Sequence, residues 1–150
     1  MSDTPRIAFL ASTNPGSPLA PLAKIASGGE LSRFMLAIKV VLADVNATPT
    51  MIFDEVDTGI GGAVADAVGK RLQLLGTHVQ VLVVTHQPQV AAKGTAHLKV
   101  QKEVKEGVTS TAVTVLGPAE RKEELARMLA GEHITHEARA AADKLLELRV

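Results

Sequence analysis

The pattern of apolar and polar positions predicts a strand, a helix and a second strand in the middle of the chain. Residues 50–53 form a short apolar run that ends on two acids, which is typical of a buried parallel strand. Residues 79–84 form a second apolar run. Between the two runs, apolar residues recur at helical spacing and a glycine is placed to end the helix: Val64, Val68, Leu72, Leu75 and Gly76. This order predicts one βαβ unit and therefore a parallel sheet.

The residues before this unit predict a strand, a loop and a helix. Residues 6–12 favour a short strand. Three prolines and a glycine in residues 13–21 are expected to exclude regular structure there. Residues 30–45 are good helix formers, apolar on most sides, so we expect a helix that its neighbours bury.

The residues after the unit predict a hairpin and two helices. Residues 98–104 and 108–116 flank the turn sequence 105–107, and Thr and Val alternate in the second arm. Two further helices are expected over about residues 119–130 and 135–148, separated by a glycine.

Composition indicates an ordinary globular chain without a strongly charged surface. Its 150 residues are about the size of one domain, and 46% are hydrophobic. Sixteen Lys and Arg balance sixteen Asp and Glu, so any contact with DNA would be local or lie outside this chain. The absence of cysteine excludes disulfides. The first residues do not read as a signal peptide, and the longest apolar stretch, residues 34–45, is interrupted by charges. We expect a cytoplasmic protein without a membrane span, and association with the nucleoid stays open.

Asp54 and Glu55 are the first candidate for chemistry, because they follow the apolar strand directly. Nucleotide hydrolysis needs a carboxylate to hold Mg²⁺ and a second group to position or deprotonate the attacking water. Adjacent acids at a strand end can divide these roles, since neighbouring side chains point to opposite faces. A strand that simply ends in solvated acids is the alternative interpretation.

Ser27, Gly28, Gly29 and Glu30 are the second candidate, at the start of the predicted helix. Two glycines let a backbone approach a phosphate closely, and a helix N-terminus offers free N–H groups. The same residues fit a capping box, with Ser27 as the cap and Glu30 three positions later. The two interpretations are compatible.

His86 is the third candidate, directly after the second apolar strand and Thr85. Its ring could donate a hydrogen bond to a γ-phosphate or to the attacking water. A structural role is the alternative. The remaining histidines show no metal-ligand spacing: His78, His97, His133 and His136.

The order of these motifs resembles the ABC ATPases. A Ser-Gly-Gly-Glu helix start, a strand ending in Asp-Glu, an aspartate in a glycine-rich turn (Asp57) and a strand ending in histidine look like the signature motif, Walker B, D-loop and switch histidine. Within that superfamily the chain is similar to the C-terminal half of the RecN family of bacterial SMC-like repair proteins. The stretches that carry this similarity are residues 9–16, 25–33, 52–60, 84–92 and 124–129.

The resemblance implies a role for each candidate residue. Asp54 would hold the Mg²⁺ shell and Glu55 would be the general base. His86 would sense the γ-phosphate in the same subunit, and Asp57 would belong to the loop that couples two heads. Ser27 to Glu30 would reach the γ-phosphate of ATP held by the opposite head, so that hydrolysis would require a homodimer of heads.

The resemblance also implies the fold: an α/β C-terminal lobe of an ABC/SMC-type ATPase head, with a mostly parallel sheet flanked by helices, a β-hairpin and C-terminal helices. Residues 1–150 would form one head unit, with residues 118–150 as its helical tail. DNA would be contacted through the full-length protein, in recombination and double-strand-break repair.

No phosphate-binding loop of the form G-x-x-x-x-G-K followed by Ser or Thr occurs in the 150 residues. That loop supplies the N–H cradle and the lysine for the phosphates. We therefore expect no productive ATP binding by this chain alone, and a composite site completed by an N-terminal half that carries the loop. Missing strands would leave apolar sheet surface exposed. A non-catalytic interaction module and a different ABC-superfamily ATPase are the alternative functions.

Overall fold

The structure is a computed structural model, and it describes the following residues: 8, 10–12, 16, 18–21, 31, 34–38, 49–54, 56–105 and 108–148. The helix predicted over residues 30–45 is described at Leu31 and at residues 34–38, which are helical.

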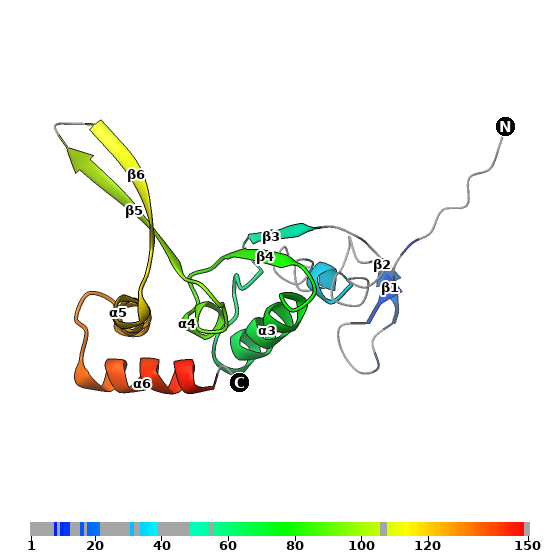
Figure 1. The fold of residues 1–150 in the computed structure, drawn as a ribbon. Coiled ribbons are helices and arrows are strands. Elements are labelled where there is room, and N and C mark those ends of the chain that lie inside the picture. The colour runs from blue at the N-terminus through cyan, green and yellow to red at the C-terminus, as the bar shows by residue number, and fades with distance from the viewer. Residues whose placement is uncertain are drawn as a thin grey trace.

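The predicted βαβ unit is present and forms the centre of the molecule (Figure 1). Strand β3 (Thr50–Asp54) leads through a turn into helix α3 (Gly62–Leu75), and strand β4 (Gln80–Val84) returns parallel to β3. The register pairs Thr50 with Gln80 and Asp54 with Val84. The two strands therefore end level with each other, and the residues that follow them emerge at one edge.

Helix α3 and strand β3 enclose the main core. Met51 and Phe53 face inward from β3, because side chains alternate along a strand. The helix contributes its buried stripe, which is Ala65, Val68, Leu72 and Leu75. Val64 was predicted to belong to this stripe, and that is wrong, since it is 52% exposed. Ala65 is buried instead, and because spacings of three and four both lie on one helix face, spacing alone did not distinguish it from Val64.

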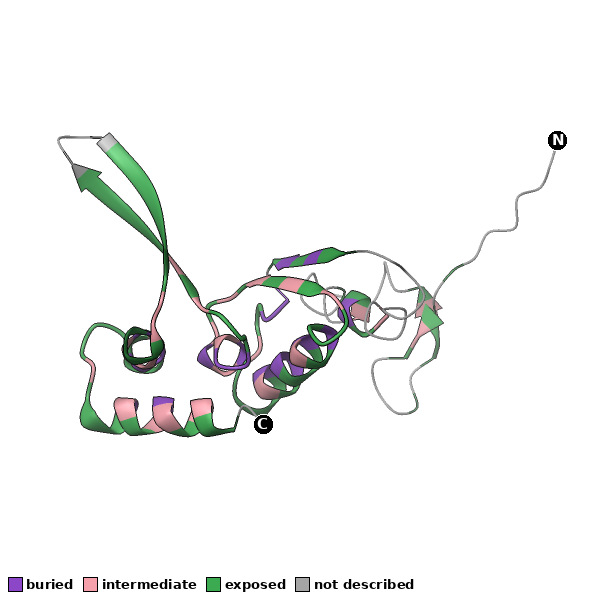
Figure 2. Cartoon of the chain, viewed as in Figure 1, coloured by how far each residue is buried: buried purple, intermediate pink, exposed green. Residues whose placement is uncertain are grey.

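The opposite face of the parallel pair is uncovered among the described residues (Figure 2). Ile52, Leu82 and Val84 are 69%, 45% and 60% exposed. The prediction that β3 is a buried strand is therefore wrong for one of its two faces. The predicted exposed apolar sheet surface is present on that face.

A second correction concerns residues 13–21, where regular structure was predicted to be absent. Strand β2 (Ala20–Pro21) pairs antiparallel with β1 (Leu10–Ala11). Pro21 lies opposite Leu10 at the end of this two-residue ladder. A proline is compatible with such an edge position, because its missing N–H removes no bond within a larger sheet.

The C-terminal part contains the predicted hairpin and both predicted helices. Strands β5 (Leu98–Lys105) and β6 (Val108–Val115) pair antiparallel and project away from the rest of the molecule (Figure 1). Helices α5 (Pro118–Ala130) and α6 (His136–Glu147) pack on each other. A short helix, α4 (Pro88–Ala91), was not predicted. No described helix has the length and apolar character that crossing a membrane requires.

Two buried cations join α4 to the helices around it. Arg121 of α5 donates from Nη2 to three carbonyl oxygens at the end of α4, at 2.6 to 3.1 Å. Lys93 donates to the Leu148 carbonyl at 2.6 Å, and its Nζ lies 3.3 Å from Asp66 of α3. The hydrogen bond from Lys70 is the main cause that lowers the pKa of Asp66 below its usual value. Helix α4 is therefore held from both sides.

Leu75→Ala should destabilise the chain by about 2–5 kcal/mol, because Leu75 is 1% exposed and its loss leaves a cavity under the sheet. Leu74→Ala is the matched control, since the Leu74 side chain is 48% exposed. Urea unfolding followed by circular dichroism gives both free energies. Equal losses for the two variants would contradict the described core.

Candidate functional site

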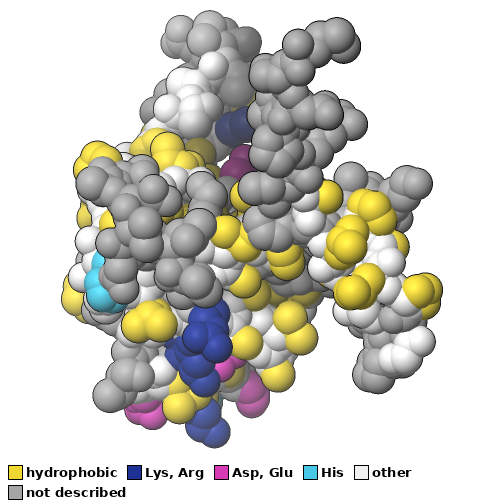
Figure 3. All heavy atoms as spheres, turned by 90° about the vertical axis from the view of Figure 1, so that its right-hand side faces the viewer, with side chains coloured by type: hydrophobic (Ala, Val, Ile, Leu, Met, Phe, Trp, Pro, Cys, Tyr) yellow, Lys and Arg dark blue, Asp and Glu magenta, His cyan; other side chains and the backbone are white. Residues whose placement is uncertain are grey.

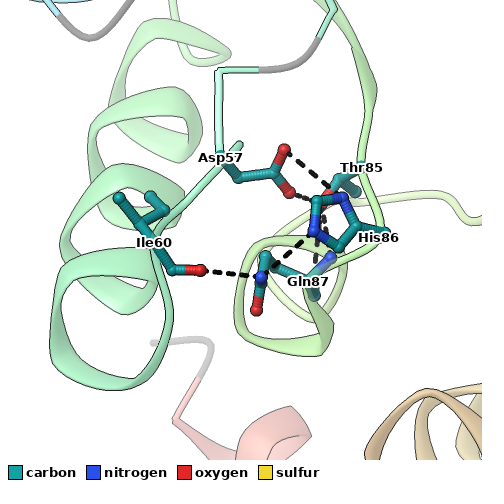
Figure 4. Close-up of polar contacts among 5 residues, drawn as sticks. All are labelled: Asp57, Ile60, Thr85, His86 and Gln87. Carbon is teal, nitrogen blue, oxygen red and sulfur yellow. Dashed lines mark hydrogen bonds and ion pairs between the residues drawn. The ribbon is translucent and has the colours of Figure 1, made fainter. Parts of the chain in front are cut away.

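The site lies at the carboxyl edge of the parallel pair, where the chain leaves β3 and β4. Asp57 comes from the turn after β3, and Thr85, His86 and Gln87 follow β4 directly. Figure 4 shows these side chains together with the backbone carbonyl of Ile60. The parallel register brings the two segments to the same edge.

Asp57 is the fully buried acid of this site, with none of its surface exposed. Its Oδ2 accepts a hydrogen bond from the Thr85 hydroxyl (Figure 4). Its Oδ1 has no hydrogen-bond partner among the described residues and lies 4.0 Å from His86 Nδ1. A buried carboxylate is costly unless polar groups compensate it. Thr85 is therefore the residue that makes this burial tolerable.

The hydroxyl of Thr85 is itself fixed by the backbone. The Gln87 N–H donates to Thr85 Oγ1 at 2.9 Å. Because a hydroxyl has only one proton, accepting this bond leaves that proton for Asp57. The contact ties the end of β4 to the turn after β3.

The Gln87 side chain makes a second connection between the same two segments. Its Nε2 donates to the Ile60 carbonyl at 2.7 Å and lies 3.3 Å from His86 Nε2. The Ile60 N–H in turn donates to the Asp57 carbonyl at 3.3 Å. Gln87 is also the residue directly before α4, so this side chain joins the start of α4 to the turn after β3.

The structure brings two of the predicted site residues together. Asp57 and His86, which are 29 positions apart in sequence, lie side by side (Figure 4). Asp57 points inward to Thr85, whereas the His86 ring is 68% exposed. Asp54 ends β3 and is exposed. The other predicted residues lie outside the described ranges: Glu55, Ser27, Gly28, Gly29 and Glu30.

Sequence reasoning missed the roles of Thr85 and Gln87. Both residues stood beside a candidate histidine, but neither was assigned a contact. A threonine directly after an apolar strand is a weak signal, because its partner Asp57 comes from a different segment. Only the packing of the two segments shows the pairing.

Asp54 is the described residue best suited to a divalent cation. Mg²⁺ is usually bound by one or two carboxylates together with waters and substrate phosphates, so a single exposed carboxylate at a strand end fits this mode. No group of three metal-binding side chains occurs among the described residues.

Sequence comparison relates the chain to RecN. It is 59% identical to the DNA repair protein RecN of Xylella fastidiosa (strain 9a5c), over 95% of this chain and 26% of that protein. The identity is 55% with RecN of Rickettsia conorii over the same shares. With RecN of Vibrio cholerae it is 54%, over 93% of this chain and 25% of that protein. No family model matches. The resemblance to RecN is confirmed, and the chain spans about a quarter of these relatives' length.

Structural comparison confirms the predicted fold class. A solved chain from work on the ATP-driven dimerization and DNA-stimulated activation of SMC ATPases superposes with a TM-score of 0.57. The match covers 84% of this chain and 83% of that chain at 20% sequence identity. The α/β arrangement described above is therefore shared with that chain.

Thr85→Val should lower the free energy of unfolding by about 1–3 kcal/mol, because it leaves the buried Asp57 carboxylate without its hydrogen bond. Thr114→Val on the exposed hairpin is the control with the same change of side chain. Urea unfolding at neutral pH measures both variants. A Thr85→Val protein as stable as the Thr114→Val protein would show that Asp57 does not depend on this hydroxyl.

Proposed function

We propose that this chain, whose sequence is similar to a segment of RecN, is the part of a RecN-type ATPase head that activates the attacking water and senses the γ-phosphate. The observation that carries the proposal is the joint placement of Asp57 and His86 at the edge where β3 ends in Asp54. In parallel α/β sheets this edge is where ligands bind. Nucleotide hydrolysis is the function that fits this edge. Its role in DNA repair is inferred from the similarity to RecN.

The proposed division of work follows from the chemistry of the residues. Bound Mg²⁺ supplies charge neutralisation for the phosphates of ATP. Asp54 would hold Mg²⁺ through its exposed carboxylate, and Glu55 would take the proton of the attacking water. The exposed ring of His86 is available to the γ-phosphate. Asp57 lies behind that ring and holds the two loops together.

The second half of the proposal concerns a partner head. Ser27, Gly28, Gly29 and Glu30 stand at the start of the predicted helix, and such a start offers free N–H groups to an anion. We infer that they reach the γ-phosphate of ATP held by a second copy, so that two heads hydrolyse ATP only as a homodimer. The ATP-driven dimerization of the SMC ATPases, with which this chain shares its fold, is consistent with this arrangement.

The phosphate-binding loop has to come from elsewhere in a complete head, because the 150 residues do not contain one. The uncovered face of β3 and β4 supports this. Ile52, Leu82 and Val84 form an exposed apolar face that a neighbouring segment would bury favourably. We infer that this segment belongs to the N-terminal half that carries the loop.

Contact with DNA is proposed for the complete protein rather than for this chain. Its positive and negative charges balance, which gives no net attraction to a phosphate backbone. On the face drawn in Figure 3, Lys and Arg side chains appear in a small group at the lower centre and in a separate spot higher up, among apolar and acidic side chains. An extended basic surface is not visible among the described residues of that face.

Glu55→Gln tests the catalytic proposal in a head reconstituted from this chain and a RecN polypeptide that carries the phosphate-binding loop. ATP turnover should fall by about 10²- to 10⁴-fold, because the general base is lost while the shape of the side chain is kept. Glu132→Gln, an exposed residue after α5, is the matched control. Phosphate release at saturating ATP is the measurement, and unchanged turnover in the Glu55 variant would remove the assigned role.

Gly28→Asp separates the catalytic proposal from that of a non-catalytic interaction module. A carboxylate at this position should repel the γ-phosphate of the opposite head and lower both ATP-dependent dimerisation and turnover. Sedimentation with and without ATP measures the dimer, and phosphate release measures turnover. If Gly28→Asp abolishes binding to the partner head, and the partner hydrolyses ATP at the same rate with and without this chain, the interaction module is favoured instead.

A further inference from the structure

Gln87 is the residue of the site whose chemistry the proposed function does not use. Its amide lies between two segments, with Nε2 at 2.7 Å from the Ile60 carbonyl and at 3.3 Å from His86 Nε2. The Gln87 side chain is half-buried, and it contacts the ring of His86, which is proposed to sense phosphate. Figure 4 shows the amide between these two groups.

The Ile60 carbonyl determines which end of the amide faces the ring. A carbonyl oxygen only accepts hydrogen bonds, so the NH₂ end of Gln87 has to face it. The amide oxygen in that place would put two acceptors in contact. The orientation of the Gln87 amide is thus set by the backbone rather than chosen by the ring.

The oriented amide in turn determines the role of His86 Nε2. An NH₂ group carries two donors and no acceptor, and one of the two serves Ile60. The second is left for the ring nitrogen 3.3 Å away, and a hydrogen bond there requires His86 Nε2 to accept. In a neutral imidazole one nitrogen donates and the other accepts, which leaves the proton on Nδ1.

The other side of the ring is consistent with that assignment. His86 Nδ1 lies 4.0 Å from Asp57 Oδ1, a buried oxygen without a hydrogen-bond partner among the described residues. The distance is too long for a hydrogen bond, yet an N–H in this direction is attracted by the carboxylate. A bare Nδ1 would instead place a lone pair toward it.

We propose that Gln87 is a positioning residue that holds neutral His86 as the tautomer protonated on Nδ1, directed at Asp57. The ring itself is largely exposed, so without Gln87 it would follow the preference of free imidazole for a proton on Nε2. The importance of this device for ATP hydrolysis rests on the proposed function. The tautomer itself does not.

The proposal changes how His86 can meet a phosphate. In the Nδ1-protonated form, the only N–H of the neutral ring faces Asp57, and Nε2 is an acceptor. Donation from Nε2 to a phosphate oxygen therefore requires a second proton on the ring, with Asp57 beside the resulting charge.

The tautomer can be read directly from the ¹⁵N-labelled 150-residue chain, by NMR correlation of the ring protons of His86 with both ring nitrogens at a pH where the ring is neutral. A protonated and a bare ring nitrogen have well-separated shifts. We expect the protonated-type shift at Nδ1. A protonated-type shift at Nε2 in the unaltered chain would overturn the proposal without any variant.

Gln87→Met should move His86 to the Nε2-protonated form, because methionine keeps the approximate length of the side chain and removes the donor. Gln101→Met, an exposed residue on β5, is the matched control and should leave the shifts of His86 unchanged. Gln87→Glu is the second variant, since its carboxylate accepts from Nε2 and favours the same reversal. A native tautomer retained in both folded Gln87 variants would contradict the proposal.

A further measurement separates this inference from the proposed function. In the reconstituted head, Gln87→Met should change the pH profile of kcat and leave KM for ATP unchanged, because the neutral ring then carries on Nε2 the proton that the native ring lacks there. If Glu55→Gln leaves turnover intact while the His86 shifts reverse in Gln87→Met, the catalytic assignment fails and the positioning role stands. If Glu55→Gln abolishes turnover while the His86 shifts stay native in Gln87→Met, only the role of Gln87 is overturned.

Discussion

The hydrogen bond between the Thr85 hydroxyl and the buried Asp57 carboxylate is the contact on which the site depends. Burial removes the water that would otherwise solvate the carboxylate, so the acid is stable there only while protein groups take the place of that water. The Thr85 hydroxyl does so at Oδ2, and the His86 ring lies next to Oδ1. One acid thereby fixes the turn after β3 to the end of β4, and it sets where the histidine stands.

The rest of the fold keeps these two segments in place. The core under β3 holds the first, because Met51 and Phe53 anchor the strand just before the turn. The second continues into α4, whose end is bound by the buried guanidinium of Arg121. The helical tail is therefore connected to the site: Arg121 of α5 binds the end of α4, and Gln87 directly precedes α4.

The regular elements were largely predictable because they follow from local periodicity. The βαβ unit, the hairpin and both tail helices need only the spacing of apolar residues and the position of glycines. The errors have local causes as well. Val64 matches the helical spacing but lies one position from the buried stripe, and Ile52 is apolar without being covered. Whether an apolar residue is buried depends on which segments pack against it, and the spacing of residues along the chain does not give that information.

The sequence by itself determined the motif order and the likeness to RecN, because residue types at fixed spacing are written in it directly. It also placed an acid pair and a histidine at strand ends. Only the tertiary structure decided that Asp57 turns inward, that Thr85 holds it, and that Gln87 lies between Ile60 and His86. The Thr85–Asp57 and Gln87–Ile60 contacts join residues 28 and 27 positions apart, and they form here because two parallel strands end at the same edge.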